Sequence, residues 1–175
     1  MAASGKLLAA AFWASLVLSN APSLALLSGC GNGEAKSPNP TRPLDERRAL
    51  EVIRQAMISE GAEPAPPRDV TLVTGSVLKV DVSVQNKEYG VAYITVDDAQ
   101  KLGKNIPPPN KKDERLRLAR AGTDGEVRIV LLYQENYLYD DLAGEAHEQT
   151  AIATEKSLAR DVQDFITHAR TQKYK

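Results

Sequence analysis

Apolar residues recur at helical spacing in two long stretches of the chain, 44–60 and 154–171. In the first stretch the apolar positions are Ala49, Leu50, Ile53, Ala56 and Met57. In the second they are Leu158, Val162, Phe165, Ile166 and Ala169. Apolar residues three and four positions apart form one stripe on a helix, so both stretches predict amphipathic helices. Gly61 provides an end for the first helix.

Between these helices the apolar residues alternate with polar ones, which is typical of strands with one buried face. A short strand is expected over residues 70–74, followed by a turn at Gly75 and Ser76. Residues 78–84 predict one half-buried strand, because apolar positions alternate there with Lys79, Asp81 and Ser83; the apolar positions are Leu78, Val80, Val82 and Val84. Residues 86–90 then predict a turn, and residues 90–96 the return strand of a hairpin.

The middle of the chain predicts a second, shorter helix over residues 97–102. Asp97 is a suitable N-cap and Gly103 a suitable C-terminal stop. The sequence Ile106-Pro-Pro-Pro-Asn110 that follows has the composition of a rigid connector.

A second strand pair is expected over residues 115–120 and 127–133, joined by a turn at 122–125. Residues 129–133 are apolar at every position, which favours a central strand covered on both faces. Residues 135–149 carry no clear period and predict an irregular stretch.

The order of these elements is helix, strands, short helix, strands, helix. Strands that follow one another through short turns favour antiparallel pairing. The sequence therefore predicts an α+β fold, in which a mainly antiparallel sheet is packed by an N-terminal and a C-terminal helix.

Residues 1–29 differ from the remainder of the chain, because Lys6 is their only charged residue. The apolar run at 7–18 is long enough for the hydrophobic core of an export signal. Asn20 and Pro22 interrupt it, which disfavours a permanent membrane-spanning helix.

The end of this region, Leu27-Ser28-Gly29-Cys30, resembles the lipobox of bacterial lipoproteins. The resemblance covers the first 30 residues and implies that Cys30 receives diacylglycerol on its sulfur, after which a peptidase cuts before it. The mature chain would then be held to a membrane by lipid, since two or more acyl chains anchor stably. Gly31 after the cysteine favours the periplasmic face of the outer membrane, under the sorting pattern of enterobacterial lipoproteins.

Residues 30–43 have the composition of a flexible tether, rich in proline, glycine and serine. Extended like polyproline, residues 31–43 would reach roughly 40 Å. Residues 44–175 are then expected to form a single domain, large enough to fold without a disulfide or a metal.

Composition and charge narrow the class of protein only slightly. The formal net charge of −1 gives no overall field that would attract nucleic acid, which we do not expect as a partner. Cys30 is the only cysteine, so the domain has no internal disulfide and no thiolate zinc site. No cofactor is expected.

The strongest candidate for chemistry or binding is the segment 137–148, which gathers tyrosines and acidic residues without a Lys or Arg between Ile129 and Glu155. Its candidate residues are Tyr137, Tyr139, Asp140, Asp141, Glu145, His147 and Glu148. Carboxylates and an imidazole are able to hold a divalent cation or to act as acid and base. The spacing matches no named metal motif, and we favour a solvated acidic loop as the ordinary interpretation.

A basic stretch runs from Lys101 to Arg120 and is a second candidate surface. It would suit anionic lipid headgroups or a cell-wall polymer. The favoured alternative is that its arginine-bearing strand lies beside the acidic segment and balances the charge of that segment.

Catalytic signatures are absent from the sequence. It contains no phosphate-binding loop, no Gly-x-Ser-x-Gly elbow and no CxxC motif. The element order is similar to that of restriction-endonuclease-like nucleases, and Asp81 would suit their first acidic position. However, residues 90–95 lack the acidic-x-Lys motif, so this alternative is set aside.

The leading hypothesis is a non-enzymatic envelope lipoprotein, whose domain binds a partner protein or a cell-wall component through Tyr137, Tyr139 and the acidic residues after them. The second is a membrane-tethered hydrolase that uses residues 140–148, with or without the help of a metal. A third is an assembly subunit that oligomerises through exposed apolar residues on a long helix.

Overall fold

The computed structural model describes residues 40–110, 116–140 and 149–175, all within one compact unit, Ser37–Lys175. The helices are α1 (Glu46–Ser59), α2 (Val96–Leu102) and α3 (Ala151–Thr171), with 3-10 turns η1 (Gly103–Asn105) and η2 (Gln134–Asn136). The strands are β1 (Arg42–Pro43), β2 (Pro64–Ala65), β3 (Arg68–Thr71), β4 (Val77–Val80), β5 (Val82–Val84), β6 (Gly90–Ile94), β7 (Arg117–Ala121), β8 (Val127–Tyr133) and β9 (Leu138–Tyr139).

The predicted α+β fold is confirmed. The main sheet has five strands in the order β2-β5-β6-β8-β7, and β1-β9 and β3-β4 form separate two-stranded pairs. All of these pairings are antiparallel except β6 with β8, which run parallel. The parallel pair is possible because α2, the proline connector and β7 supply the long crossover that such strands require.

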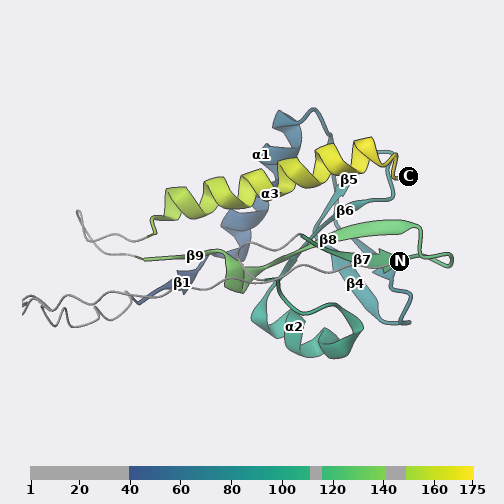
Figure 1. Ribbon diagram of the computed structural model, residues 1–175, viewed down its shortest axis with the longest axis horizontal. Helices are drawn as coiled ribbons and strands as arrows, with labels where there is room; N and C mark the ends of the chain where they lie inside the picture. The colour runs from purple at the N-terminus through teal and green to yellow at the C-terminus, as the bar shows by residue number, and fades with distance from the viewer. Residues whose placement is uncertain (1–39, 111–115, 141–148) are drawn as a thin grey trace, which may run out of the picture. The chain divides into compact units, whose positions relative to one another are not determined.

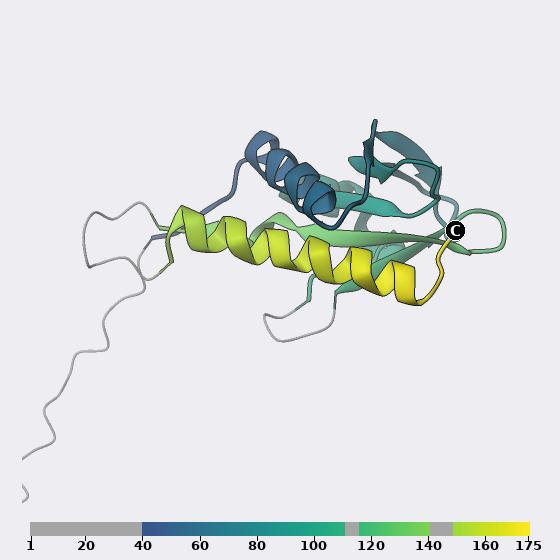
Figure 2. The same ribbon diagram turned by 90° about the horizontal axis from the view of Figure 1, so that it is seen from above.

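The helices lie on opposite faces of the main sheet. Figure 1 shows α1 and α3 above the strands and α2 below them. From above, α1 and α3 lie side by side across the sheet (Figure 2). Each of these two helices therefore shields the sheet and packs against the other.

The first core lies between the sheet and the helices α1 and α3. The predicted apolar stripe of the last helix is confirmed, because its five residues are all buried; they are Leu158, Val162, Phe165, Ile166 and Ala169. From the sheet, Val130 and Leu132 of β8 enter the same core. Side chains of this kind contribute about 1.5–3 kcal/mol each when they are fully buried.

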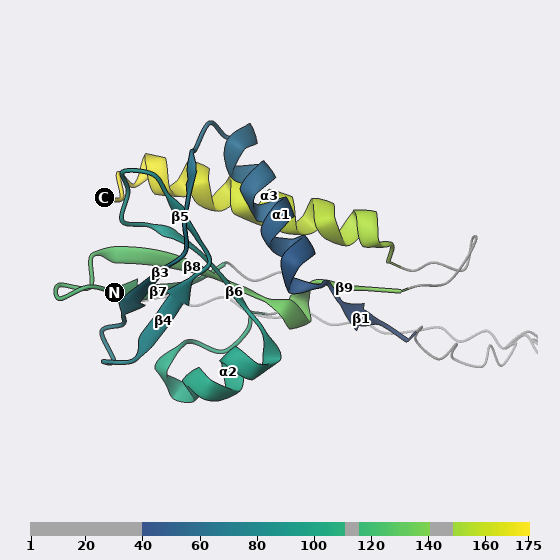
Figure 3. The same cartoon turned by 180° about the vertical axis from the view of Figure 1, so that it is seen from behind.

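A second core lies on the other face of the sheet, beneath α2 and the β3-β4 hairpin. Ile129, Leu131 and Tyr133 of β8 point into it, alternating with the residues of the first core. The expectation that residues 127–133 form a strand covered on both faces is thus confirmed. Figure 3 shows the hairpin beside β7, where Val73 N donates to Arg120 O at 3.1 Å.

The expected single strand 78–84 is wrong, because the chain changes sheets at Asp81. Leu78 and Val80 face the second core, whereas Val82 and Val84 face the first. Asp81 makes the transition possible by bonding to β6 with both backbone and side chain. Its N–H donates to Val91 O at 2.9 Å, and its Oδ2 accepts from Tyr93 N at 2.9 Å.

The helix boundaries are close to those predicted, but one predicted cap is wrong. Helix α2 begins after Thr95 rather than at Asp97. The Thr95 side chain accepts from Asp98 N, and the Asp98 carboxylate accepts from Thr95 N, which is a reciprocal capping box. Gly103 ends the helix with φ of 51°, as predicted for a glycine stop.

The folded part begins slightly before the predicted boundary. Arg42 and Pro43, assigned from the sequence to the tether, pair with Tyr139 and Leu138 as strand β1. Leu44 N then donates to Tyr137 O at 2.9 Å. The chain therefore enters the domain beside β9.

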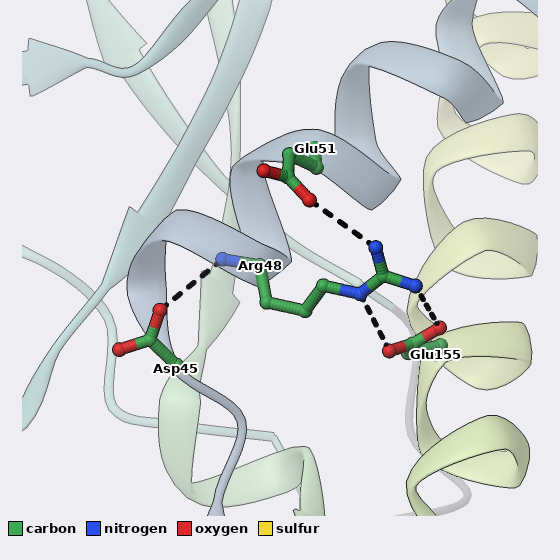
Figure 4. Close-up of polar contacts among 4 residues, drawn as sticks. All are labelled: Asp45, Arg48, Glu51 and Glu155. Carbon is green, nitrogen blue, oxygen red and sulfur yellow. Dashed lines mark hydrogen bonds and ion pairs between the residues drawn. The ribbon is translucent and has the colours of Figure 1, made fainter.

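A forked ion pair joins the outer sides of α1 and α3. Arg48 Nε lies 2.7 Å from Glu155 Oε1, and Arg48 Nη2 lies 2.9 Å from Glu155 Oε2 (Figure 4). Arg48 also reaches Glu51 at 3.2 Å within its own helix. Through this arrangement the ion pair holds the two helices together above their shared apolar contact.

None of the helices in the part of the chain that the structure describes combines the length and apolar character needed to span a membrane.

Candidate functional site

The described part of the predicted tyrosine and acid segment lies between the start of the domain and the N-terminal end of α3. Strand β9 pairs with β1, and Leu138 O accepts from the Thr154 hydroxyl at 2.7 Å. Asp140 and Gln149 bond to each other on the two sides of residues 141–148. Asp140 N donates to Gln149 O at 2.8 Å, and Gln149 N donates to Asp140 Oδ2 at 2.9 Å.

Tyr137 is a core residue rather than part of an exposed surface. It is 3% exposed, and its ring stacks on Tyr93 with centroids 6.3 Å apart. The Tyr93 hydroxyl donates to Leu44 O at 3.0 Å. A partner would therefore not contact the Tyr137 ring face, and removing this ring would disturb the first core.

Tyr139 and Asp140 also have structural contacts. The Arg42 guanidinium lies over the ring of half-buried Tyr139, at 4.9 Å from the centroid. Asp140 is only 2% exposed. Asp141, Glu145, His147 and Glu148 lie outside the described residues, so the structure does not bring the predicted acidic cluster together or separate it.

A polar cavity lies directly beside this segment. Its volume is about 380 Å³, at the small end of ligand-binding pockets. It is walled by the end of the proline connector, η2, the start of β9 and one side of α3; the polar residues are Asn110, Glu135, Asn136, Tyr137, Gln149, Ser157, Arg160 and Asp161. The cavity thus gathers polar groups from segments that are far apart in the sequence.

Several of these groups are already hydrogen-bonded to one another. Asn136 Nδ2 donates to Asn110 Oδ1 at 3.0 Å, and Gln149 Nε2 donates to the Thr154 hydroxyl at 3.1 Å. In contrast, the Ser157 hydroxyl and the Arg160 guanidinium form neither hydrogen bonds nor ion pairs with any described residue. Within the described ranges, these two groups on α3 therefore keep hydrogen-bonding capacity that a ligand could use.

A hydrogen bond between Tyr137 and Asp161 forms part of the cavity wall. The Tyr137 hydroxyl donates to Asp161 Oδ2 at 2.7 Å. Burial raises the pKa of Asp161 above its usual value of 3.8, while the Tyr137 hydroxyl and Arg160 partly counteract this shift. Burial, followed by the negative charge of Asp161, raises the pKa of Tyr137 as well, so Tyr137 remains a hydrogen-bond donor throughout the neutral range.

A second cavity, of about 450 Å³, lies between β4, the end of β6 and the start of α2. Its charged groups are largely engaged by the fold. Lys79 Nζ lies 2.9 Å from Asp81 Oδ1, and the pKa of Lys79 is raised mainly by this contact. Asp98 caps α2. This cavity is therefore the weaker candidate for ligand binding.

The basic stretch is not arranged as the sequence indicated. Its arginine-bearing strand β7 pairs with β8, and β9 pairs with β1, so β7 is not paired with the described part of the acidic segment. Lys111, Lys112 and Arg115 lie outside the described residues.

Metal ligands and histidines add little to the site. In the three described ranges there is no group of three or more His, Cys, Asp and Glu side chains that could hold a metal ion. His168, exposed on α3, contacts the Tyr174 hydroxyl at 3.2 Å through Nε2. It lies next to the buried stripe of the helix.

Sequence reasoning missed the residues that complete the cavity, above all Asn110, Arg160 and Asp161. Arg160 and Asp161 lie on the polar side of a helix, where charged residues are the rule. Asn110 follows three prolines and resembles an ordinary loop residue. No local signal distinguishes these residues from solvated ones.

In comparisons with known proteins, no protein-family model, no curated protein and no solved structure matches the chain.

Proposed function

We propose that this protein is a bacterial envelope lipoprotein, anchored by lipid on Cys30, whose α+β domain acts as a non-enzymatic binding module. The observation that carries the proposal is the sequence Leu27-Ser28-Gly29-Cys30 at the end of an apolar leader. A thiol is the nucleophile that lipid transfer requires, and the small Ser28 and Gly29 give the peptidase access to the backbone.

The way in which the chain enters the domain supports a binding role close to the anchor. Strand β1 pairs with β9, and Leu138 of β9 lines the polar cavity. Residues 30–41 would then connect the lipid directly to the end of the domain that carries the cavity. A ligand or partner in the envelope would be met at this end, on the periplasmic face of the outer membrane.

The expected partner is an envelope protein or a cell-wall component. Tyr139 and the residues from 141 onward remain the predicted contact surface, whereas buried Tyr137 would support this surface from within. Mutation of Tyr137 is therefore a poor test of binding, because it would disturb the core.

The intact mass of the protein, expressed with its leader in a bacterial host, tests the anchor. We expect a chain that starts at Cys30 and carries acyl groups, and that sediments with membranes. Cys30→Ala should abolish processing, acylation and membrane association together. Ser37→Ala, a change of similar size in the tether, is the matched control and should leave all three unchanged.

An unmodified mass that retains residues 1–29 would overturn the proposal. So would a Cys30→Ala chain that is processed and retained on membranes to the same extent as the parent.

A further inference from the structure

The polar cavity beside β9 combines free hydrogen-bonding groups with spare capacity in paired ones. The side chains of Ser157 and Arg160 form neither hydrogen bonds nor ion pairs with any other described residue. Asn136 Nδ2 donates to Asn110 Oδ1, so the amide nitrogen of Asn110 and the amide oxygen of Asn136 are not used in this bond. The Asp161 carboxylate uses Oδ2 for Tyr137, which leaves Oδ1 for another donor. The wall therefore presents donors and acceptors close together.

The charges of the cavity disfavour strongly charged ligands. Among the described residues that line the cavity, Arg160 contributes the one positive charge, and Glu135 and Asp161 are the acidic residues. Burial raises the pKa of Asp161, so the negative charge of this carboxylate is disfavoured where it stands. A phosphate or another multivalent anion would meet one cation against two carboxylates, and Arg160 would compete with a cationic ligand.

An apolar ligand is also disfavoured. It would cover the Arg160 guanidinium, the Ser157 hydroxyl and the spare amide groups without replacing the hydrogen bonds that these groups make to water. A saccharide matches the wall better, because each of its hydroxyl groups is both donor and acceptor. The cavity volume of about 380 Å³ suits a small part of such a chain.

We propose that this cavity binds the sugar rings of an uncharged envelope glycan, with Arg160, Ser157 and Asn136 as ligand contacts. Tyr137 is a positioning residue. Its hydroxyl holds Asp161 through a hydrogen bond of 2.7 Å, while its ring stays buried in the core. The identification of the glycan source rests on the proposed envelope location, whereas the saccharide chemistry rests on the cavity alone.

Calorimetric titration of the full-length protein in detergent, with cellotriose and chitotriose as probes, tests the proposal. The two probes separate recognition of hydroxyl groups alone from recognition of hydroxyl and N-acetyl groups. We expect saturable binding of at least one probe, with a Kd of about 1 mM or lower. Inorganic phosphate should neither bind nor compete.

Two variants on the same helix distinguish sugar binding in the cavity from non-specific binding to the protein surface. Arg160→Met removes a charged donor from the cavity and should weaken binding about tenfold, as expected for a hydrogen bond to a charged group. Lys156→Met, on the same helix but outside the cavity, is the matched control and should change the Kd less than about twofold. Asn136→Ala changes an exposed turn outside α3 and should also weaken binding of the trisaccharide.

Each outcome separates this inference from the proposed anchor. If neither trisaccharide binds while Cys30 is acylated, the ligand class is wrong and the lipoprotein assignment stands. If the sugar binds while Cys30 is unmodified, the assignment of the cavity as a sugar site stands. The proposal that the glycan comes from the envelope is then wrong. Equal affinities of Arg160→Met and Lys156→Met, with unfolding transitions like the parent, would place sugar binding elsewhere and overturn the inference.

Discussion

The hydroxyl oxygen of Tyr137 lies 2.7 Å from Oδ2 of Asp161, which joins the segment before β9 to the middle of α3. The two residues differ in burial, because Tyr137 is 3% exposed and Asp161 is half-buried. The bond therefore connects the first core to the wall of the polar cavity. It also makes the ionisation of Asp161 sensitive to a residue in the core.

Tyr137→Phe should raise the pKa of Asp161 further, because the Tyr137 hydroxyl stabilises the carboxylate. The loss of this bond should cost about 1 kcal/mol of unfolding free energy. Carboxyl-carbon NMR titration and urea unfolding measure the two effects. Tyr139→Phe is the control, and it should leave the pKa of Asp161 unchanged. An unaltered titration in Tyr137→Phe would show that the contact does not form in solution.

Asp161→Asn should become more stabilising as the pH rises. The folded-state pKa of Asp161 is raised above 3.8, so the folded chain retains this proton longer than the unfolded chain. The resulting stability is present below pH 3.8 and is lost as the pH rises through the folded-state pKa. The uncharged amide avoids this loss and keeps an oxygen for Tyr137. Urea unfolding of the parent and the variant between pH 3 and 7 tests this pH dependence. A difference in unfolding free energy that stays constant over this range would contradict it.

The pair formed by Arg48 and Glu155 should show the opposite pH dependence. Arg48 lowers the pKa of Glu155 below 4.5, so its stabilisation is present above this value and disappears as the pH falls through the folded-state pKa. A double-mutant cycle with Arg48→Met and Glu155→Gln measures the coupling. The coupling should shrink in high salt, because the side chains are 52% and 23% exposed. A second double-mutant cycle, with Arg48→Met and Glu51→Gln, is the control, because both of its residues lie on α1.

Asp81→Ala should destabilise the domain by about 1–3 kcal/mol, because it leaves the buried N–H of Tyr93 without its acceptor. Asp81 is 6% exposed, so water would not readily replace the carboxylate. Lys79→Ala removes the exposed partner of the same carboxylate and should have a smaller effect. Thermal unfolding compares the two variants. Equal losses would mean that the ion pair, rather than the bond to β6, holds the chain at Asp81.

Gly90→Ala should cost about 1–3 kcal/mol, because a Cβ there would lie 2.6 Å from Val80 Cγ1 and 3.0 Å from Val82 O. Val80→Ala removes the first of these contacts and is itself destabilising. In the Val80→Ala background, the additional cost of Gly90→Ala should therefore be smaller. Chemical unfolding of the four proteins tests this coupling, and strictly additive losses would exclude the close approach.

The sequence by itself determined the elements that depend on local periodicity. The two long helices have apolar stripes at helical spacing, and residues 129–133 are apolar on both faces, so their burial follows from their own residues. The candidate lipid site at Cys30 is likewise a local motif, and it stays a prediction. Local patterns are informative here because each element carries the complete pattern within itself.

Only the tertiary structure decided how alternating residues are divided between two cores. Leu78, Val80, Val82 and Val84 share one pattern in the sequence, yet Asp81 sends the two halves to opposite faces of the sheet. Pattern alone does not fix the partner of a strand, because alternation only tells which residues share a face. The parallel pairing of β6 with β8 was equally hidden, since it depends on a long crossover.

The cavity and the burial of Tyr137 were also decided by tertiary contacts. The predicted tyrosine surface assumed that Tyr137 and Tyr139 were accessible, but packing against Tyr93 and the bond to Asp161 bury Tyr137. Asn110 and Arg160 approach the same cavity from distant parts of the chain. The physical reason is that burial and hydrogen bonding depend on distances between side chains, which the sequence determines only through the complete fold.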